Sequence, residues 1–180
     1  SPAKTIKAGL GFVPEDRHRD GFVGEFSIAE NLVLNNLDAY SRNGSLQLGA
    51  IADNAVARIK EFDIRSESHT QPVNALSGGN QQKVVLAREL SRPLSLLLAS
   101  QPTRGVDVGA IEFLHKRIVE ERDVGTAVLI VSTELEEVES LADRIAVMYR
   151  GKIVGVVGPD TPRDVLGLMV TNRRALVRAL

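Results

Sequence analysis

The sequence predicts an α/β fold with an inserted α-helical subdomain, and three patterns support this. Residues 94–99 form a run that is apolar except for Ser95 and is bounded by proline and polar residues, which is typical of a parallel strand buried on both faces, and residues 126–132 predict a second strand. Between residues 24 and 92, apolar side chains instead recur at helical spacing. A shorter apolar segment, residues 6–13, precedes them, so the helices are expected to interrupt an α/β core.

Composition narrows the classes of protein to consider. The 180 residues are 43% hydrophobic and 25% charged, enough for one or two small lobes with a core. A formal net charge of −1 gives no global electrostatic reason to expect a nucleic acid partner. With no cysteine, a disulfide framework and a thiolate metal site are both excluded, in agreement with a reducing compartment. No apolar run approaches the roughly 20 residues that span a bilayer, so any membrane role is expected to come through a partner.

The N-terminal segment predicts a strand followed by a charged loop. Residues 6–13 are apolar enough for a short strand, and Pro14 ends it before the charged residues 15–20. The apolar residues after the loop suit either a small satellite core or a contact surface: Phe22, Val23 and Phe26.

The region from 24 to 92 reads as a compact helical subdomain. Ser27 and Glu30 have the spacing of a capping box and predict a helix start. Residues 35–49 lose periodicity and predict a loop. A second helix is indicated by one apolar stripe: Ile51, Ala55, Val56, Ile59 and Phe62. Pro93 closes the subdomain.

A glycine turn, residues 76–83 with the sequence LSGGNQQK, leads into a third helix in this region. Two adjacent glycines let a ligand approach the backbone, and the unpaired N–H groups and dipole of a helix N-terminus favour an anion such as phosphate. The alternative is that Ser77 simply caps the helix. That helix is marked by four apolar residues: Val84, Val85, Leu86 and Leu90.

Polar residues follow both predicted core strands. Ser100 and Gln101 come after the first strand and Thr133 after the second, at the carboxyl ends where open α/β sheets place their chemistry. Asp107 has the position of an N-cap for the next helix. The apolar stripe of that helix is Ile111, Leu114 and Ile118.

The C-terminal part predicts a helix from about Glu134, a hairpin and a last helix. Two strands, 144–149 and 152–157, are joined across an Arg150-Gly151 turn, and residues 161–164 form a helix start. The basic and apolar tail, residues 172–180, predicts either more helix or a solvated end. The three histidines lack metal-ligand spacing and are interpreted as surface or interface residues: His18, His69 and His115.

Four strings, which occur along the chain in the order found in the family, resemble the ATP-binding cassette (ABC) family. LSGGNQQK with VVLAREL resembles the signature motif in the form found in importers of simple sugars and nucleosides. GFVPEDRHRDG resembles the segment that replaces the Q-loop in the second cassette of their fused two-cassette subunits. QPTRGVDVGA resembles the end of Walker B and the D-loop, and ADRIAVMYRGKIVG the late hairpin. The chain is identified as a member of this family.

The resemblance implies a P-loop NTPase-type core and assigns roles to individual residues. Glu15 occupies the Q-loop-like segment, and the charged loop with its following apolar residues would lie near the surface that receives the transmembrane coupling helix. Asp107 would be the D-loop acid facing the partner cassette, which is compatible with a capping role. The signature residues would bind nucleotide: Ser77, Gly78, Gly79, Asn80 and Gln81.

Three positions depart from the pattern of a working cassette. The family carries an Asp that holds Mg²⁺ and a Glu that polarises water, where this chain has Ser100 and Gln101. Thr133 stands in place of the switch histidine and cannot carry a positive charge. Together they imply a degenerate hydrolytic site, although each could simply be a polar residue closing a strand.

The sequence contains no G-x-x-x-x-G-K-[ST] string and therefore no Walker A loop. We expect the chain to be the C-terminal part of a second cassette, with only the later strands of the core. On its own it should bind ATP weakly or not at all, hydrolyse none, and self-associate through its cut sheet. The expected division is a strand and Q-loop-like segment at 1–23, the helical subdomain at 24–92, the core at 93–158 and a C-terminal helix and tail at 159–180.

The resemblance implies an asymmetric ATPase subunit. Cassettes dimerise head to tail, so the signature would serve the ATP of the first cassette, with Mg²⁺ needed in the full subunit. The expected partners are that cassette and transmembrane permease subunits, with no nucleic acid, at the cytoplasmic face of the membrane as a peripheral protein. QPTRGVD is most similar to nucleoside-type systems. The alternatives are a soluble non-transport ABC ATPase and a non-hydrolysing interaction module.

Overall fold

The computed structural model describes residues 1–171 and divides the chain into two compact units. The first unit is Ser1–Val131, and the second is Ser132–Leu180, described as far as Thr171. The division falls inside the predicted core segment 93–158, and the four-part division of the chain stays a prediction. Within the described part, no helix combines the length and apolar character needed to cross a membrane.

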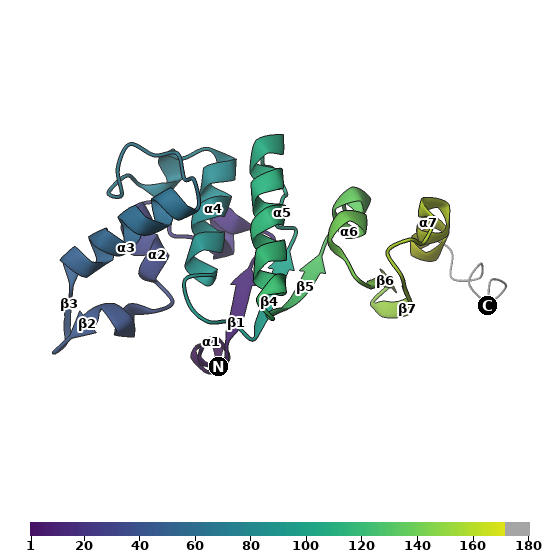
Figure 1. Ribbon diagram of the computed structural model, residues 1–180, viewed down its shortest axis with the longest axis horizontal. Helices are drawn as coiled ribbons and strands as arrows, with labels where there is room; N and C mark the ends of the chain where they lie inside the picture. Colours follow the sequence, from purple (N-terminus) through teal and green to yellow (C-terminus); the bar gives the residue numbers. More distant parts are fainter. Residues whose placement is uncertain (172–180) are drawn as a thin grey trace. The chain divides into compact units, whose positions relative to one another are not determined.

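The first unit contains a three-stranded parallel sheet, next to helices α4 (Gly78–Glu89) and α5 (Val108–Asp123) (Figure 1). Its order is β1 (Leu10–Val13), β4 (Leu96–Ser100) and β5 (Ala127–Val131), and Leu98 of the central strand lies between Phe12 and Leu129. The predicted strands 94–99 and 126–132 are therefore confirmed as parallel neighbours. Their burial differs from the prediction, because only one face of β4 is fully buried.

The buried face of β4 carries Leu97 and Ala99, which join one core cluster with helices α4 and α5. On the opposite face, Leu98 of β4 is only half-buried. The core cluster thus packs against one side of the sheet and leaves the other side partly open.

The start of the first strand corrects the sequence prediction. Residues Pro2–Lys7 form helix α1, so β1 begins at Leu10 and not at Ile6. Proline in the first turn has φ preset for a helix, and Gly9 at φ 89° ends it in the left-handed region that favours glycine. The strand ends before Pro14, as predicted.

The helical insert contains three α-helices, α2 (Ile28–Val33), α3 (Leu48–Glu61) and α4, and α2 packs against both of the others. Helix α2 starts at the capping box, in which Ser27 Oγ accepts from Glu30 N and the Glu30 carboxylate accepts from Ser27 N, so this prediction is confirmed. The predicted loop at 35–49 contains a short 3₁₀ turn and a two-residue hairpin: η2 (Leu37–Tyr40), β2 (Ser41–Arg42) and β3 (Ser45–Leu46).

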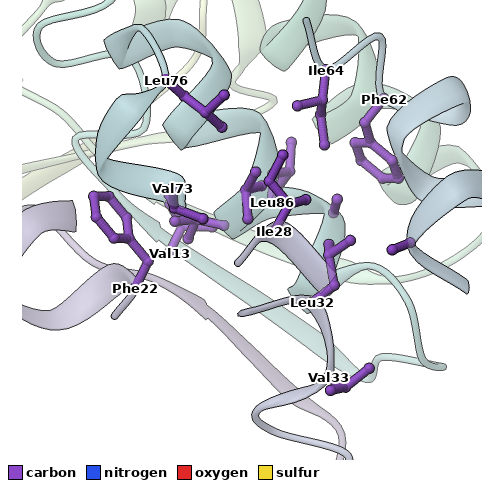
Figure 2. Packing of buried hydrophobic residues seen from close by; sticks show 14 of the residues in the cluster. Val13, Phe22, Ile28, Leu32, Val33, Phe62, Ile64, Val73, Leu76 and Leu86 are labelled. Carbon is purple, nitrogen blue, oxygen red and sulfur yellow. The ribbon is translucent and has the colours of Figure 1, made fainter. Parts of the chain in front are cut away.

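Figure 2 shows the core of this insert, where side chains of α2, of α4 and of the segment after α3 meet. Of the predicted α3 stripe, Ile51, Ala55 and Phe62 are buried, but Val56 is 58% exposed. At about 100° per residue, Val56 lies about 140° around the helix from Ile51 and so leaves the buried face. Among the apolar residues after the charged loop, only one joins the core: Phe22, whereas Val23 and Phe26 are exposed.

The second unit is a small α/β module. Helix α6 (Leu135–Leu141) is preceded by Glu134, and β6 (Ile145–Tyr149) pairs antiparallel with β7 (Lys152–Val157). Arg150 and Gly151 both have positive φ, as a tight hairpin turn requires. Helix α7 (Arg163–Thr171) packs against β6. The predicted tail, residues 172–180, lies outside the described residues.

Candidate functional site

The glycine turn caps helix α4, as one of the two sequence interpretations predicted. Ser77 is exposed and extended, and its Oγ accepts from Asn80 Nδ2 at 2.9 Å and from Asn80 N at 3.5 Å. Asn80 Oδ1 accepts in turn from Arg65 N at 2.9 Å. Both of these side chains therefore hold the helix start in a defined geometry.

The two glycines pack against a second turn of the same chain, residues 101–107. A Cβ on Gly78 would lie 2.9 Å from Gly105 O, and one on Gly79 would lie 2.8 Å from Asp107 Oδ2. The sequence alone suggested that these glycines leave room for a ligand. The structure shows that the space beside each Cα is already filled by this chain.

Gln81 supports the turn from inside. It is buried, and its Nε2 donates to Leu76 O at 3.1 Å and to Val73 O at 3.4 Å, within the short turn η3 (Val73–Ala75) and the residue after it. This amide orients the backbone that leads into the signature residues. Direct nucleotide contact by Gln81 stays a prediction.

Arg17 is the functional candidate that the sequence analysis missed. It starts the π-helical turn η1 (Arg17–Gly21), and its Nη1 donates to Arg104 O at 2.7 Å and its Nη2 to Gly105 O at 3.2 Å. Its Nε donates to Gln81 Oε1 at 3.4 Å. The only signal in the sequence was its place in the charged segment after β1, which it shares with several other charged residues.

Burial lowers the pKa of the Arg17 guanidinium from its usual value, and the charge of Asp16 opposes this shift. An arginine pKa lies so far above neutrality that the side chain stays charged. The guanidinium therefore offers charge-assisted hydrogen bonds to the carbonyl groups of residues 104 and 105.

Glu15 and Asp107, the predicted Q-loop-like and D-loop residues, both make contacts at the turn 101–107. Glu15 forms an ion pair with the Arg104 side chain, and because both are mostly exposed the pair adds little stability. Asp107 Oδ1 accepts from Ala110 N at 3.0 Å, which confirms that it caps α5. Its contact with a partner cassette stays a prediction.

The carboxyl ends of the strands hold the three substituted positions. Ser100 ends β4, and Gln101 follows with φ 49° and donates its N–H to Val131 O at 2.7 Å. Thr133 belongs to the second unit. The first unit thus brings Gly78 and Gly79 against the turn that contains Asp107, and Thr133 is not part of that unit.

The residues after β4 do not fit a magnesium ion by themselves. Mg²⁺ prefers oxygen ligands that include carboxylates. Between positions 100 and 107 the one carboxylate is Asp107, which caps α5 and faces Gly79. Among residues 1–171, no group of three or more His, Cys, Asp or Glu side chains could hold a metal ion.

Comparison with known proteins agrees with these features. A family model described as ABC transporter matches residues 2–104. A guanosine import ATP-binding protein of Bacillus subtilis is 46% identical over 175 residues, which cover 96% of this chain and 34% of the relative. A nucleoside import ATP-binding protein of Lactococcus lactis is 46% identical over 174 residues, covering 95% and 34%. A ribose import ATP-binding protein of Rubrobacter xylanophilus is 40% identical, covering 89% and 31%.

Solved structures identify the fold. The ATP-binding cassette MJ1267 of an ABC transporter superposes with a TM-score of 0.72 at 20% identity, covering 97% of this chain and 71% of that one. The dimeric ABC transporter cassette MJ0796 gives a TM-score of 0.71 at 22% identity, covering 88% and 66%. The predicted P-loop NTPase-type α/β fold is confirmed. The chain spans about one third of the length of the curated relatives it matches. It belongs to the ABC transporter family.

Proposed function

We propose that the chain is part of the ATP-binding subunit of an importer for a sugar or nucleoside, and that it supplies its signature motif in trans to the ATP site of the other cassette. The observation that carries the proposal is an intact LSGGNQQK turn at the start of a 12-residue helix, combined with uncharged residues after β4. The import relatives give the transport context.

The signature turn has the chemistry to grip a phosphate. The first amides of α4 have no partners within the helix, and the helix dipole favours negative charge there. Ser77 Oγ accepts both of its hydrogen bonds from Asn80, which leaves its hydroxyl proton for an outside acceptor. In this proposal that acceptor is the γ-phosphate of ATP held by the first cassette.

The chain's own site takes no catalytic part in this proposal. Ser100 and Gln101 supply no charge for Mg²⁺ and no general base, and Asp107 already caps a helix. ATP and Mg²⁺ therefore act at the first cassette in the full subunit. The chain alone should bind ATP weakly and hydrolyse none, because it lacks a phosphate-wrapping loop and its lysine.

The proposed partners are the first cassette and the permease subunits, with no nucleic acid, and the subunit would lie on the cytoplasmic face of the membrane as a peripheral protein. A specific surface supports the permease contact. Val23 and Phe26 are each 42% exposed and follow the Q-loop-like segment directly. Exposed apolar side chains that lie close together are typical of docking surfaces.

Co-purification tests this proposal against the soluble alternatives. The tagged full-length subunit is extracted from detergent-solubilised membranes and should bring down a polytopic membrane protein. Phe26→Asp should reduce the yield of that protein severalfold, because it puts a charge into an apolar contact. Leu48→Asp is the control, since Leu48 is also exposed but starts helix α3. Recovery of the subunit without any membrane protein would favour a soluble ABC ATPase or an interaction module.

A further inference from the structure

Three segments that lie far apart in the sequence meet at the Arg17 side chain. Its guanidinium donates to two carbonyl groups of the turn after β4, Arg104 O and Gly105 O, and to Gln81 Oε1 on helix α4. Arg17 itself belongs to the charged segment after β1. One side chain therefore connects the Q-loop-like segment, the signature helix and the D-loop turn.

The connection reaches the backbone of the signature turn by two routes. The first is direct, because a Cβ on Gly78 would lie 2.8 Å from Arg17 Nη2, so the guanidinium packs against the turn. The second runs through Gln81, which accepts from Arg17 and donates to Leu76 O. Loss of the guanidinium would remove both supports at once.

The segment that carries Arg17 is a hydrogen-bonded turn whose outer side chains are exposed. Asp16 Oδ1 accepts from the backbone N–H groups of residues 18 and 19. In the same π-helical turn, Asp20 N–H donates to Asp16 O and Phe22 N–H donates to Arg17 O. The side chains of residues 18 to 20 are exposed, while Phe22 is buried. The turn is tied to the core at one end, because Phe22 N–H donates to Arg17 O and the His18 ring contacts the Phe22 ring.

We propose that Arg17 is a positioning residue that locks the signature turn, residues 76–80, to the turn at 101–107, and that the Q-loop-like segment thereby sets how Ser77 is presented. This inference rests on the proposed function for its effect on ATP hydrolysis. The locking of the two turns does not depend on that function and is measurable by itself.

Hydrogen exchange of the full-length subunit tests the lock directly. Arg17→Gln removes the charge and two carbonyl contacts, and amide exchange should rise about tenfold at residues 76–80 and 101–107. Arg17→Lys retains the charge without the planar fork and should give a smaller rise at the same amides. The matched control is Arg19→Gln, because Arg19 is 80% exposed and pairs only weakly with its neighbour Asp20.

The exchange pattern decides the outcome. A rise confined to the two turns in both Arg17 variants, and absent in Arg19→Gln, supports the lock. Unchanged exchange at residues 76–80 overturns it. A uniform rise across the chain also overturns it, because that pattern shows general destabilisation and no specific role for Arg17.

Steady-state kinetics with the membrane partners test the consequence for the proposed function. Arg17→Gln should lower kcat about tenfold and leave the KM for ATP nearly unchanged, because the signature turn would act after nucleotide has bound the first cassette. Arg17→Lys should recover part of the loss. A raised KM with unchanged kcat would overturn the positioning role, whereas a wild-type subunit without ATPase activity would defeat the proposed function and leave the exchange result standing.

Discussion

The carboxylate of Glu89, near the end of helix α4, accepts a hydrogen bond from the backbone N–H of Phe12 at 3.3 Å. Arg92 donates to Leu10 O on the same strand, and Glu89 lies within 3.6 Å of Arg92 and 2.9 Å of Arg88. The outer edge of β1 is thus closed by charged side chains from the end of helix α4 and from Arg92 after it. A second strand would have to displace them to pair there.

The first prediction concerns this buried charge cluster. Glu89→Ala should destabilise the chain by about 3 kcal/mol, because it leaves two largely buried arginines without their counter-charge and Phe12 N–H without an acceptor. Urea unfolding measures the difference. Glu112→Ala, at an exposed position of α5, should change the free energy of unfolding by less than about 0.5 kcal/mol. Equal effects of the two substitutions would contradict a special role for the cluster.

The second prediction concerns self-association of the chain. Because β1 is closed, association is expected through β5 and the open face of the sheet, where Leu129 is 53% exposed beside half-buried Leu98. Light scattering should show oligomers that grow with protein concentration, and Leu129→Lys should shift them toward monomer. Val124→Lys is the control, since Val124 is exposed after the end of α5. A clean monomer at high concentration would be evidence against the whole expectation.

The third prediction separates the signature from the substituted site in the full transporter. Ser77→Ala should lower ATP hydrolysis on the order of 10²-fold, because it removes one preorganised donor to the transition state. Gly78→Asp should be at least as severe, although part of its effect comes from the clash with Gly105 O and Arg17. Ser45→Ala, in the exposed hairpin strand β3, serves as the control for an ordinary serine.

The complementary variant restores the consensus acids at the other site. Ser100→Asp combined with Gln101→Glu should change the rate of ATP hydrolysis little, because Thr133 still lacks an imidazole. If the signature variants retained activity and Gln101→Glu raised it severalfold, the asymmetric function proposed above would be wrong.

The fourth prediction is a pH dependence at the start of helix α2. The side-chain hydrogen bond from Ser27, followed by its backbone hydrogen bond, lowers the pKa of Glu30 below its usual value. A lowered folded-state pKa means that the stabilisation is present above the unfolded pKa of about 4.3 and is lost as the pH falls through the folded value. Glu30→Gln should therefore lower the melting temperature at pH 7, by an amount equivalent to about 0.5 kcal/mol for this exposed group.

Thermal melts of both proteins between pH 7 and pH 3 measure this effect. The difference between wild type and Glu30→Gln should shrink as the pH falls below about 4. A difference that stays constant over this range would mean that the ionised carboxylate of Glu30 contributes nothing to the cap.

Local chemistry by itself determined several features of this protein. The capping box at Ser27 and the N-cap at Ser77 need only residues three positions apart, so the sequence shows them directly. The parallel strand β4, the Asp107 cap and the hairpin turn at Arg150 likewise follow from short-range preferences of side chain and backbone. The family follows from short motifs in a fixed order.

Tertiary structure decided what depends on residues that are distant in the chain. Arg17 and Arg104 are 87 positions apart, and no local pattern marks Arg17 among its charged neighbours as the side chain that bridges three segments. The packing of Gly78 against Gly105 and the exposure of Val56 could not be predicted from the sequence either. Each depends on which neighbouring element packs against that residue in the folded chain. Motif residues can be read from sequence, whereas the contacts that position them exist only once the chain has folded.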